Sequence, residues 1–327
     1  MLNVGLVGLG PEWECRYRPA LAKLERRLKV RCVHASIVSQ AEQAAAELGC
    51  DVAPGLVSFM ERDDVQAILV LDTSWHGSAP ALFACQVGKP AFLDRRFANR
   101  LREADQLLQQ AAQTGVMLMP GFAHRYTPAT ARLRELIATR LGRPRALVVD
   151  VAANCEPRGT ESTLSETGRD MLAVAVDWST SLIGSVPAEI QAARNPSMAG
   201  RLEANVEFRR PSVGGAAPVA LIRLTTPGPV APANSTANAC DTSIGLRANV
   251  ECVHGTALLE GPLNVTWSLA SGDSPGGHIA ESLVSDRPDV EVMLDHFSRR
   301  VVGGLIPVPT LDDLFRAFRL VDSAVRP

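Results

Sequence analysis

The chain has 327 residues, 46% of them hydrophobic and 21% charged, which is typical of a globular protein long enough for two domains. Its formal net charge of -2 excludes a general surface for polyanions, so we expect no nucleic-acid partner. No stretch reaches about 18 uninterrupted apolar residues, so we expect no membrane span.

Residues 1–122 alternate short apolar runs with segments of helical spacing. The runs predict five strands, at residues 2–9, 29–36, 65–73, 89–94 and 116–122. The segments between them predict four helices, at residues 19–28, 40–49, 79–88 and 102–115. The strands are apolar on both faces, which favours a parallel sheet covered by helices on both sides. We therefore predict a doubly wound Rossmann domain over residues 1–122.

Residues 123–327 have a different pattern, in which consecutive strands follow two helices. Helices are predicted at residues 128–142, 169–184, 290–304 and 311–325. Strands are predicted at residues 145–154, 189–194, 202–210, 219–226, 246–255, 256–261 and 264–270. The segment 225–241 is rich in Pro, Asn and Ala and predicts a flexible loop. We therefore predict an α+β domain over residues 123–327, with a large, open, mostly antiparallel sheet.

A glycine-rich turn follows the first predicted strand. Gly8-Leu9-Gly10 lies where a dinucleotide pyrophosphate would rest on a helix N-terminus. The third glycine of the usual G-x-G-x-x-G pattern is replaced by Trp13, whose indole requires a wider turn. The second predicted strand ends His34-Ala35-Ser36, without the carboxylate that binds a ribose 2′-hydroxyl and without an arginine for a 2′-phosphate. By itself the Gly-x-Gly pair is also compatible with an ordinary tight turn.

The cysteine and histidine residues do not form recognisable clusters. Seven cysteines lack any CxxC pair, which indicates isolated core thiols and a cytoplasmic protein. No His, Cys and Asp residues have the spacing of metal ligands, so no metal site is expected.

Several short motifs occur in one order along the chain. They are Arg18-Pro19-Ala20-Leu21, His76, Gly88-Lys89, the run Gly121 to Pro128, Asp170 with Asp177 and Gly184, and the closing segment 297–324. This order resembles the glucose–fructose oxidoreductase/inositol dehydrogenase family, also called Gfo/Idh/MocA. The resemblance implies NAD(P)-dependent oxidation or reduction of a sugar- or polyol-like small molecule. It also implies a homo-oligomer formed through the C-terminal sheet.

The resemblance carries residue roles onto this sequence. It implies a cofactor site formed by Gly8, Leu9, Gly10, Trp13, Ala35, Ser36, Leu71, Asp72, His76, Asp94 and Arg95. It implies a catalytic site at Arg95, Asp170 and Val174, with Tyr126 and Asp177 as substrate contacts. Structural explanations stay open. His76 is then an ordinary loop histidine and Asp170 a helix cap, Arg125 and Tyr126 join the two domains, and Asp177 holds its helix against its neighbours.

The catalytic positions depart from the family pattern. Arg95 stands where the family has a lysine, and an arginine cannot give up its proton at working pH. Val174 stands where the family has the histidine of Asp-x-x-x-His, so the usual general base is missing. Three interpretations follow: an oxidoreductase with an atypical active site, an inactive relative that binds a ligand or nucleotide, and a cofactor-assisted glycosidase or lyase.

Overall fold

The computed structural model describes residues 1–94, 103–152, 166–194, 201–209, 216–225, 245–270 and 277–325. The chain forms two compact units, one of Met1–Ala123 with Val290–Phe315, the other of His124–Asp289 with Arg316–Pro327. Relative to the predicted domains, the segment Val290–Phe315 groups with the first unit. The predicted loop 225–241 lies outside the described residues except for Thr225.

A parallel six-stranded sheet forms the centre of the first unit. Its strands are β1 (Leu2–Val7), β2 (Leu28–His34), β3 (Asp51–Val52), β4 (Ala67–Val70), β5 (Ala91–Asp94) and β6 (Leu118–Gly121). The strand order β3-β2-β1-β4-β5-β6 confirms the predicted doubly wound fold. The edge strand β3 has only two residues and was not predicted, because so short a run carries no periodic signal.

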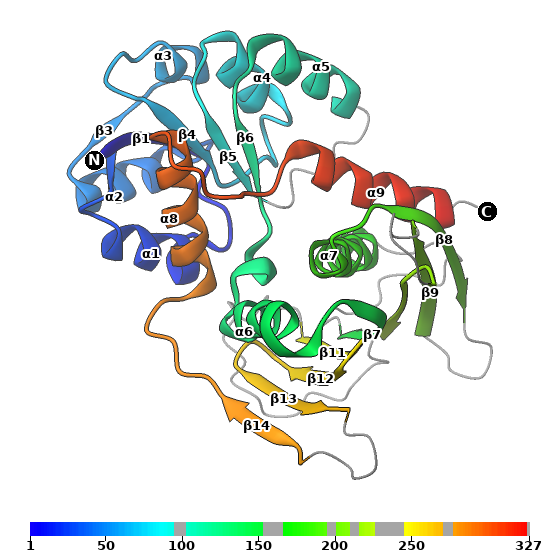
Figure 1. Ribbon diagram of the computed structural model, residues 1–327. Coiled ribbons are helices and arrows are strands. Elements are labelled where there is room, and N and C mark those ends of the chain that lie inside the picture. Colours follow the sequence, from blue (N-terminus) through cyan, green and yellow to red (C-terminus); the bar gives the residue numbers. More distant parts are fainter. Residues whose placement is uncertain are drawn as a thin grey trace, which may run out of the picture. The chain divides into compact units, whose positions relative to one another are not determined.

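Helices cover both faces of this sheet (Figure 1). They are α1 (Arg18–Lys23), α2 (Val38–Leu48), α3 (Leu56–Met60), α4 (Ala79–Gln86), α5 (Ala104–Thr114) and α8 (Asp289–Val301). The alanine-rich α2 ends at Gly49, whose φ of 62° closes the helix in the left-handed conformation. The late helix α8 joins this unit through Phe297, whose ring packs edge-on against Phe92 of β5 with centroids 6.1 Å apart. This packing explains why a segment near the C-terminus belongs to the first unit.

The second unit contains an eight-stranded sheet. Its strands are β7 (Pro144–Ala152), β8 (Pro187–Arg194), β9 (Arg201–Phe208), β10 (Val219–Thr225), β11 (Gly245–Cys252), β12 (Gly255–Glu260), β13 (Asn264–Leu269) and β14 (Ile279–Ser282). Their order is β14-β13-β12-β11-β7-β10-β9-β8, and only the β10–β7 pair is parallel. The expected large, mostly antiparallel sheet is therefore confirmed.

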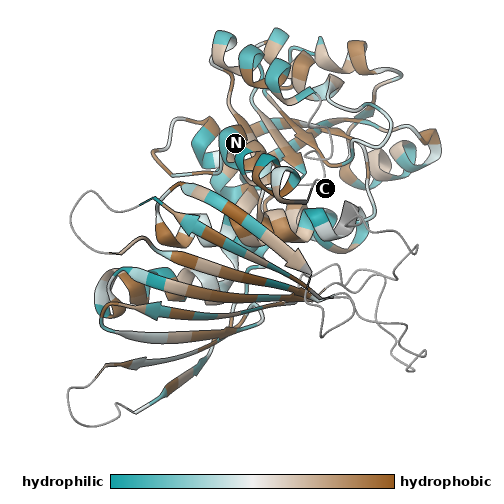
Figure 2. Cartoon of the chain, turned by 90° about the vertical axis from the view of Figure 1, so that its right-hand side faces the viewer, coloured by the Kyte–Doolittle hydropathy of each residue, from teal (hydrophilic) through white to brown (hydrophobic). Residues whose placement is uncertain are grey.

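One face of the second sheet is covered by helices α6 (Pro128–Leu136) and α7 (Glu166–Ile183). Burial alternates along the strands, as in β11, where Ala248, Val250 and Cys252 are buried and the residues between them are exposed. Figure 2 shows this mixture of hydrophilic and hydrophobic residues along the strands.

The last helix, α9 (Leu311–Val325), begins in the first unit and continues from Arg316 in the second.

The described cysteines are mostly buried or half-buried thiols. Cys32, Cys50, Cys85 and Cys252 are free. Cys15 is disulfide-bonded, so the expectation of isolated thiols is wrong at this position. Within the described ranges, no helix is long and apolar enough to cross a bilayer.

Candidate functional site: the carboxyl edge of the parallel sheet

The turn after β1 requires a glycine at its first position. Gly8 has a φ of 74°, and a Cβ atom there would lie 2.7 Å from the backbone oxygen of Asp72. Its N–H donates to the carbonyl of His34 over 2.8 Å, which ties the end of β1 to the end of β2. A side chain would be strained by both the backbone conformation and the contact with Asp72. The tight turn expected at this position is therefore present, with Leu9 half-buried and Gly10 buried beyond it.

The helix that follows begins with a wide π-helical turn, η1 (Trp13–Tyr17). The N–H of Trp13 donates to the carbonyl of Gly10 over 2.9 Å, and the N–H of Tyr17 reaches back five residues to Glu12 over 3.2 Å. The Trp13 side chain is 5% exposed. The wider turn gives the indole a buried place where the usual motif has a glycine in close contact with the strand.

An acidic side chain lies in this same turn. Glu12 is buried, and its carboxylate accepts a hydrogen bond of 2.9 Å from Arg16. A carboxylate alone would repel a pyrophosphate at a helix N-terminus, where anions otherwise bind well. The guanidinium of Arg16 compensates this charge inside the turn itself.

Two histidines from different strand ends meet beside the turn. His34 ends β2, and His76 lies in the turn between β4 and α4. Their Nε2 atoms are 3.2 Å apart, while Nδ1 of His34 lies 3.2 Å from the carbonyl oxygen of Ala53. His76 is one of the predicted cofactor residues and His34 is not, although its place at the end of a strand is a signal that the sequence contains.

The neighbouring cofactor positions differ in exposure. Ala35 is half-buried and Ser36 is exposed, whereas the side chain of Leu71 is completely buried. Asp72 accepts hydrogen bonds at Oδ1 from the N–H of Ser74 over 3.0 Å and from its hydroxyl over 2.6 Å. This local turn satisfies one carboxylate oxygen of Asp72 within its own loop.

A buried hydrogen bond fixes the end of β5. The hydroxyl of Tyr17 donates to Oδ2 of Asp94 over 2.7 Å, and both side chains are buried. Burial, and then the charge of Asp94, raises the pKa of Tyr17 well above its usual value, so the phenol stays protonated. Asp94 is paired in register with Gly121 of β6. The predicted site residue Arg95 follows directly but lies outside the described residues.

In the second unit, helix α7 carries the other predicted catalytic positions. Asp170 is half-buried, and Val174 is 1% exposed. The two positions are four residues apart and therefore lie on one face of the helix. Asp177 continues this face one turn further. The apolar Val174 thus stands between two acidic positions.

Asp177 is the centre of a buried ionic cluster. Its carboxylate accepts hydrogen bonds from Nε of Arg125 over 2.8 Å, from Nη2 of the same guanidinium, and from Nε2 of His124 over 3.3 Å. Burial raises the pKa of Asp177, but the His124 and Arg125 contacts outweigh it and the net pKa is lowered. This arrangement anchors the segment before α6 to α7, and it includes His124 and Arg125, which were not among the predicted site residues.

Tyr126 lies beside this cluster and is half-buried. Burial raises its pKa to about 12, so its hydroxyl is a neutral donor or acceptor near neutral pH. Burial, and then the charge of Arg125, lowers the pKa of Arg134, whose guanidinium donates to the Arg125 carbonyl over 3.1 Å. These contacts anchor Asp177 within the second unit, and contact with a substrate at Tyr126 and Asp177 stays a prediction.

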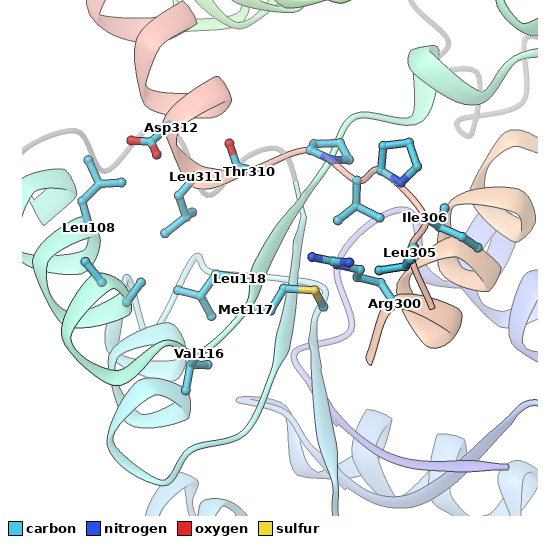
Figure 3. A pocket seen from close by; sticks show the side chains of 15 residues that line it. Leu108, Val116, Met117, Leu118, Arg300, Leu305, Ile306, Thr310, Leu311 and Asp312 are labelled. Atoms are coloured by element: carbon cyan, nitrogen blue, oxygen red, sulfur yellow. The ribbon is translucent and has the colours of Figure 1, made fainter. Parts of the chain in front are cut away.

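Two pockets lie away from the predicted site residues. One of about 480 Å³ in the first unit is lined by α5 and by residues 305–312, and it includes Val116, Met117 and Leu118 (Figure 3). Since these three residues lead into the start of β6, this pocket is at the amino end of the strand, away from the edge where dinucleotides bind. The other, of about 520 Å³, lies on the open face of the second sheet around Arg223 and Arg247.

Among the described residues, no three His, Cys, Asp or Glu side chains form a group that could hold a metal ion.

Comparison with known proteins finds a family similarity in the first unit. Residues 2–122 match the family model GFO_IDH_MocA, described as an oxidoreductase family with an NAD-binding Rossmann fold. The chain is 29% identical over 119 residues to scyllo-inositol 2-dehydrogenase (NAD(+)) from Bacillus subtilis, covering 36% of this chain and 34% of that protein. It is 29% identical over 153 residues to UDP-N-acetylglucosamine 3-dehydrogenase from Acidithiobacillus ferrooxidans, covering 47% of this chain and 46% of that protein.

Similarity of fold extends over the whole chain. A solved structure of the UDP-N-acetylglucosamine 3-dehydrogenase from Acidithiobacillus ferrooxidans superposes with a TM-score of 0.74 at 18% identity, covering 99% of this chain and 96% of that one. The sequence matches to the two curated relatives, in contrast, span less than half of their length. The family model matches residues 2–122, whereas the similarity of architecture also includes the second unit.

Proposed function

We propose that the chain, whose residues 2–122 match the Gfo/Idh/MocA family model, is an NAD(P)-dependent oxidoreductase of that type with an atypical active site. The proposed substrate is a sugar- or polyol-like small molecule, the class acted on by both curated relatives. The observation that carries the proposal is the turn at Gly8. Its left-handed backbone and its close approach to Asp72 form the tight strand-to-helix turn on which a pyrophosphate rests in dinucleotide-binding folds.

The residues at this edge fit a dinucleotide. Backbone from Gly8 to Gly10 would hold the pyrophosphate, and His34, Ser36 and His76 lie at the strand ends where the adenosine ribose would bind. A bound nicotinamide would supply the hydride acceptor or donor. The Tyr17–Asp94 hydrogen bond would stiffen the strand end that precedes Arg95, the position expected at the nicotinamide.

Proton transfer is the atypical part of the proposed mechanism. Oxidation of an alcohol needs a group that takes the hydroxyl proton in the transition state. Neither a guanidinium at Arg95 nor the side chain of Val174 can accept it. Asp170 is the remaining member of the family motif that could serve as the base. Arg95 is better suited to bind an anionic group of the substrate, a carboxylate or a phosphate.

The first test is thermal unfolding of the purified protein with each of NAD⁺, NADH, NADP⁺ and NADPH at about 1 mM. At about 100 times its Kd a ligand stabilises the folded state by about 2.7 kcal/mol, a shift of several degrees in the unfolding midpoint. A shift with at least one nucleotide supports the proposal. Absence of any shift, on protein shown to carry no nucleotide, contradicts it. Turnover is then measured by nicotinamide absorbance with scyllo-inositol and UDP-N-acetylglucosamine.

The buried Val174 favours a second candidate, a relative that binds nucleotide or ligand without turnover. The double substitution Arg95→Lys with Val174→His restores the family's two residues and separates the two candidates. If the natural chain turns over a polyol, it is an active oxidoreductase, and the double variant only changes the rate of that turnover. If the natural chain binds nucleotide but turns over no polyol, a rate that appears only in the double variant indicates lost catalysis. A glycosidase or lyase activity predicts instead that bound nucleotide is recycled without net reduction.

We also propose a homo-oligomer through the open face of the second sheet, and a cytoplasmic location. One face of that sheet is covered by α6 and α7, and the other carries outward polar side chains such as Asn249 and Thr266. Light scattering during size exclusion tests the oligomer. A monomeric mass at micromolar concentration would contradict it.

A further inference from the structure

The His34–His76 pair lies where the two forms of the cofactor differ. In dinucleotide-binding folds the 2′ position of the adenosine ribose lies at the end of the second strand. His34 is the last residue of β2, and its carbonyl accepts the N–H of Gly8 over 2.8 Å. His76 joins it from the turn after β4, with ring centroids 5.1 Å apart. An acid that would favour NAD by binding the 2′-hydroxyl is absent from positions 34–36.

The geometry assigns the protons of the pair. A carbonyl oxygen only accepts, so the Nδ1 of His34 that faces the Ala53 carbonyl at 3.2 Å carries a hydrogen. In neutral His34 the Nε2 atom is then an acceptor, and Nε2–H of His76 donates to it over 3.2 Å. One added proton goes to Nδ1 of His76 without breaking this bond. The pair can therefore hold one positive charge, with the Nδ1–H of His76 directed away from His34.

The surroundings disfavour a charge on His76 in the free protein. Burial, and then the neighbouring His34, lowers the pKa of His76, while the carboxylate of Asp72 raises it by less. On the adjacent strand β3, the charge of Asp51 is compensated by Arg62 over 2.7 Å. A phosphate dianion placed beside His76 would favour the protonated ring. His76 would thus gain its positive charge when the phosphate binds.

We propose that the His34–His76 pair is the element that selects the cofactor, and that it selects NADP(H) by donating Nδ1–H of His76 to the 2′-phosphate. The inference rests on the proposed function, because it assumes that this edge binds a dinucleotide. Binding takes up a proton, since the His76 pKa is higher in the complex than in the free protein. Preference for NADP(H) is therefore greatest at low pH and decreases as pH rises through the pKa of the complex.

The test is a direct titration of the purified full chain with NADPH and with NADH, at about pH 6.5 and about pH 8.5, where the 2′-phosphate is mostly dianionic. We expect NADPH to bind about tenfold more tightly than NADH at the lower pH and about threefold or less at the higher pH. The variant His76→Gln keeps an amide donor but has no titratable ring. We expect it to bind NADPH and NADH with equal affinity at each of the two pH values. His278→Gln, an exposed position in the second unit, is the matched control and should behave as the natural chain.

Fragments of the cofactor separate the phosphate from the rest of the nucleotide. We expect 2′,5′-ADP to displace NADPH more strongly than 5′-AMP or inorganic phosphate does. Equal affinities for NADPH and NADH in the natural chain, or an unchanged preference in His76→Gln, would overturn the inference and leave the proposed function standing. Failure of both nucleotides to bind would overturn the proposed function and the inference with it.

Discussion

Removal of the charge at Asp177 should destabilise the second unit strongly. The substitution Asp177→Asn keeps the shape of the side chain but leaves the Arg125 guanidinium without its anionic partner. The Asp177 side chain is 1% exposed and that of Arg125 13%, so water cannot replace the lost interaction. Breaking a buried ion pair from one side costs about 3–5 kcal/mol. For a protein of this size that corresponds to a decrease of about 4–7 °C in the unfolding midpoint.

The chain contains a matched control for this prediction. Arg132 and Glu281 form a pair of the same two-pronged geometry, with contacts of 2.7 and 2.9 Å, but their side chains are 25% and 22% exposed. The substitution Glu281→Gln should therefore cost only about 0–1 kcal/mol. Urea unfolding of both variants, followed by tryptophan fluorescence, gives the two free energies at unchanged slope.

Two results would refute this reasoning. One is a loss below about 1 kcal/mol for Asp177→Asn, and the other is an equal loss for Glu281→Gln. The pH dependence gives an independent check. Because the pKa of Asp177 is lowered in the folded chain, its contribution is complete above the usual aspartate pKa of about 3.9 and is lost as pH falls through the lower folded value. In Asp177→Asn this part of the acid destabilisation should disappear.

Three further substitutions test the edge of the first sheet. Gly8→Ala should abolish the nucleotide-induced shift in unfolding temperature and lower the midpoint itself, because the new Cβ would meet Asp72 at 2.7 Å; an undiminished shift would contradict the assigned turn. Tyr17→Phe removes one donor to the buried Asp94 and should cost about 1–3 kcal/mol in urea unfolding, whereas a neutral effect would mean that other groups satisfy this carboxylate. Trp13→Ala should cost about 3–5 kcal/mol, since the indole is buried, and a cost below about 1 kcal/mol would show that the wide turn does not depend on it.

Much of the fold follows from local patterns in the sequence. The apolar run 2–7 is buried on both faces, and an alanine-rich segment that stops at Gly49 forms α2. Alternation of such strands and helices leaves few arrangements, because parallel neighbours need right-handed helical crossovers. The segments without a strong period were missed. They are the two-residue β3, the short α3 and the edge strand β14.

The candidate site was predictable only in part. The sequence alone determined the glycine turn at Gly8 and the substitutions at Arg95 and Val174, because these are identities at positions of a motif. The pairings of Tyr17 with Asp94 and of His34 with His76 join residues 77 and 42 positions apart, so no local spacing indicates them. The tertiary structure decided these contacts, because parallel strands bring their carboxyl ends to one edge whatever the length of chain between them.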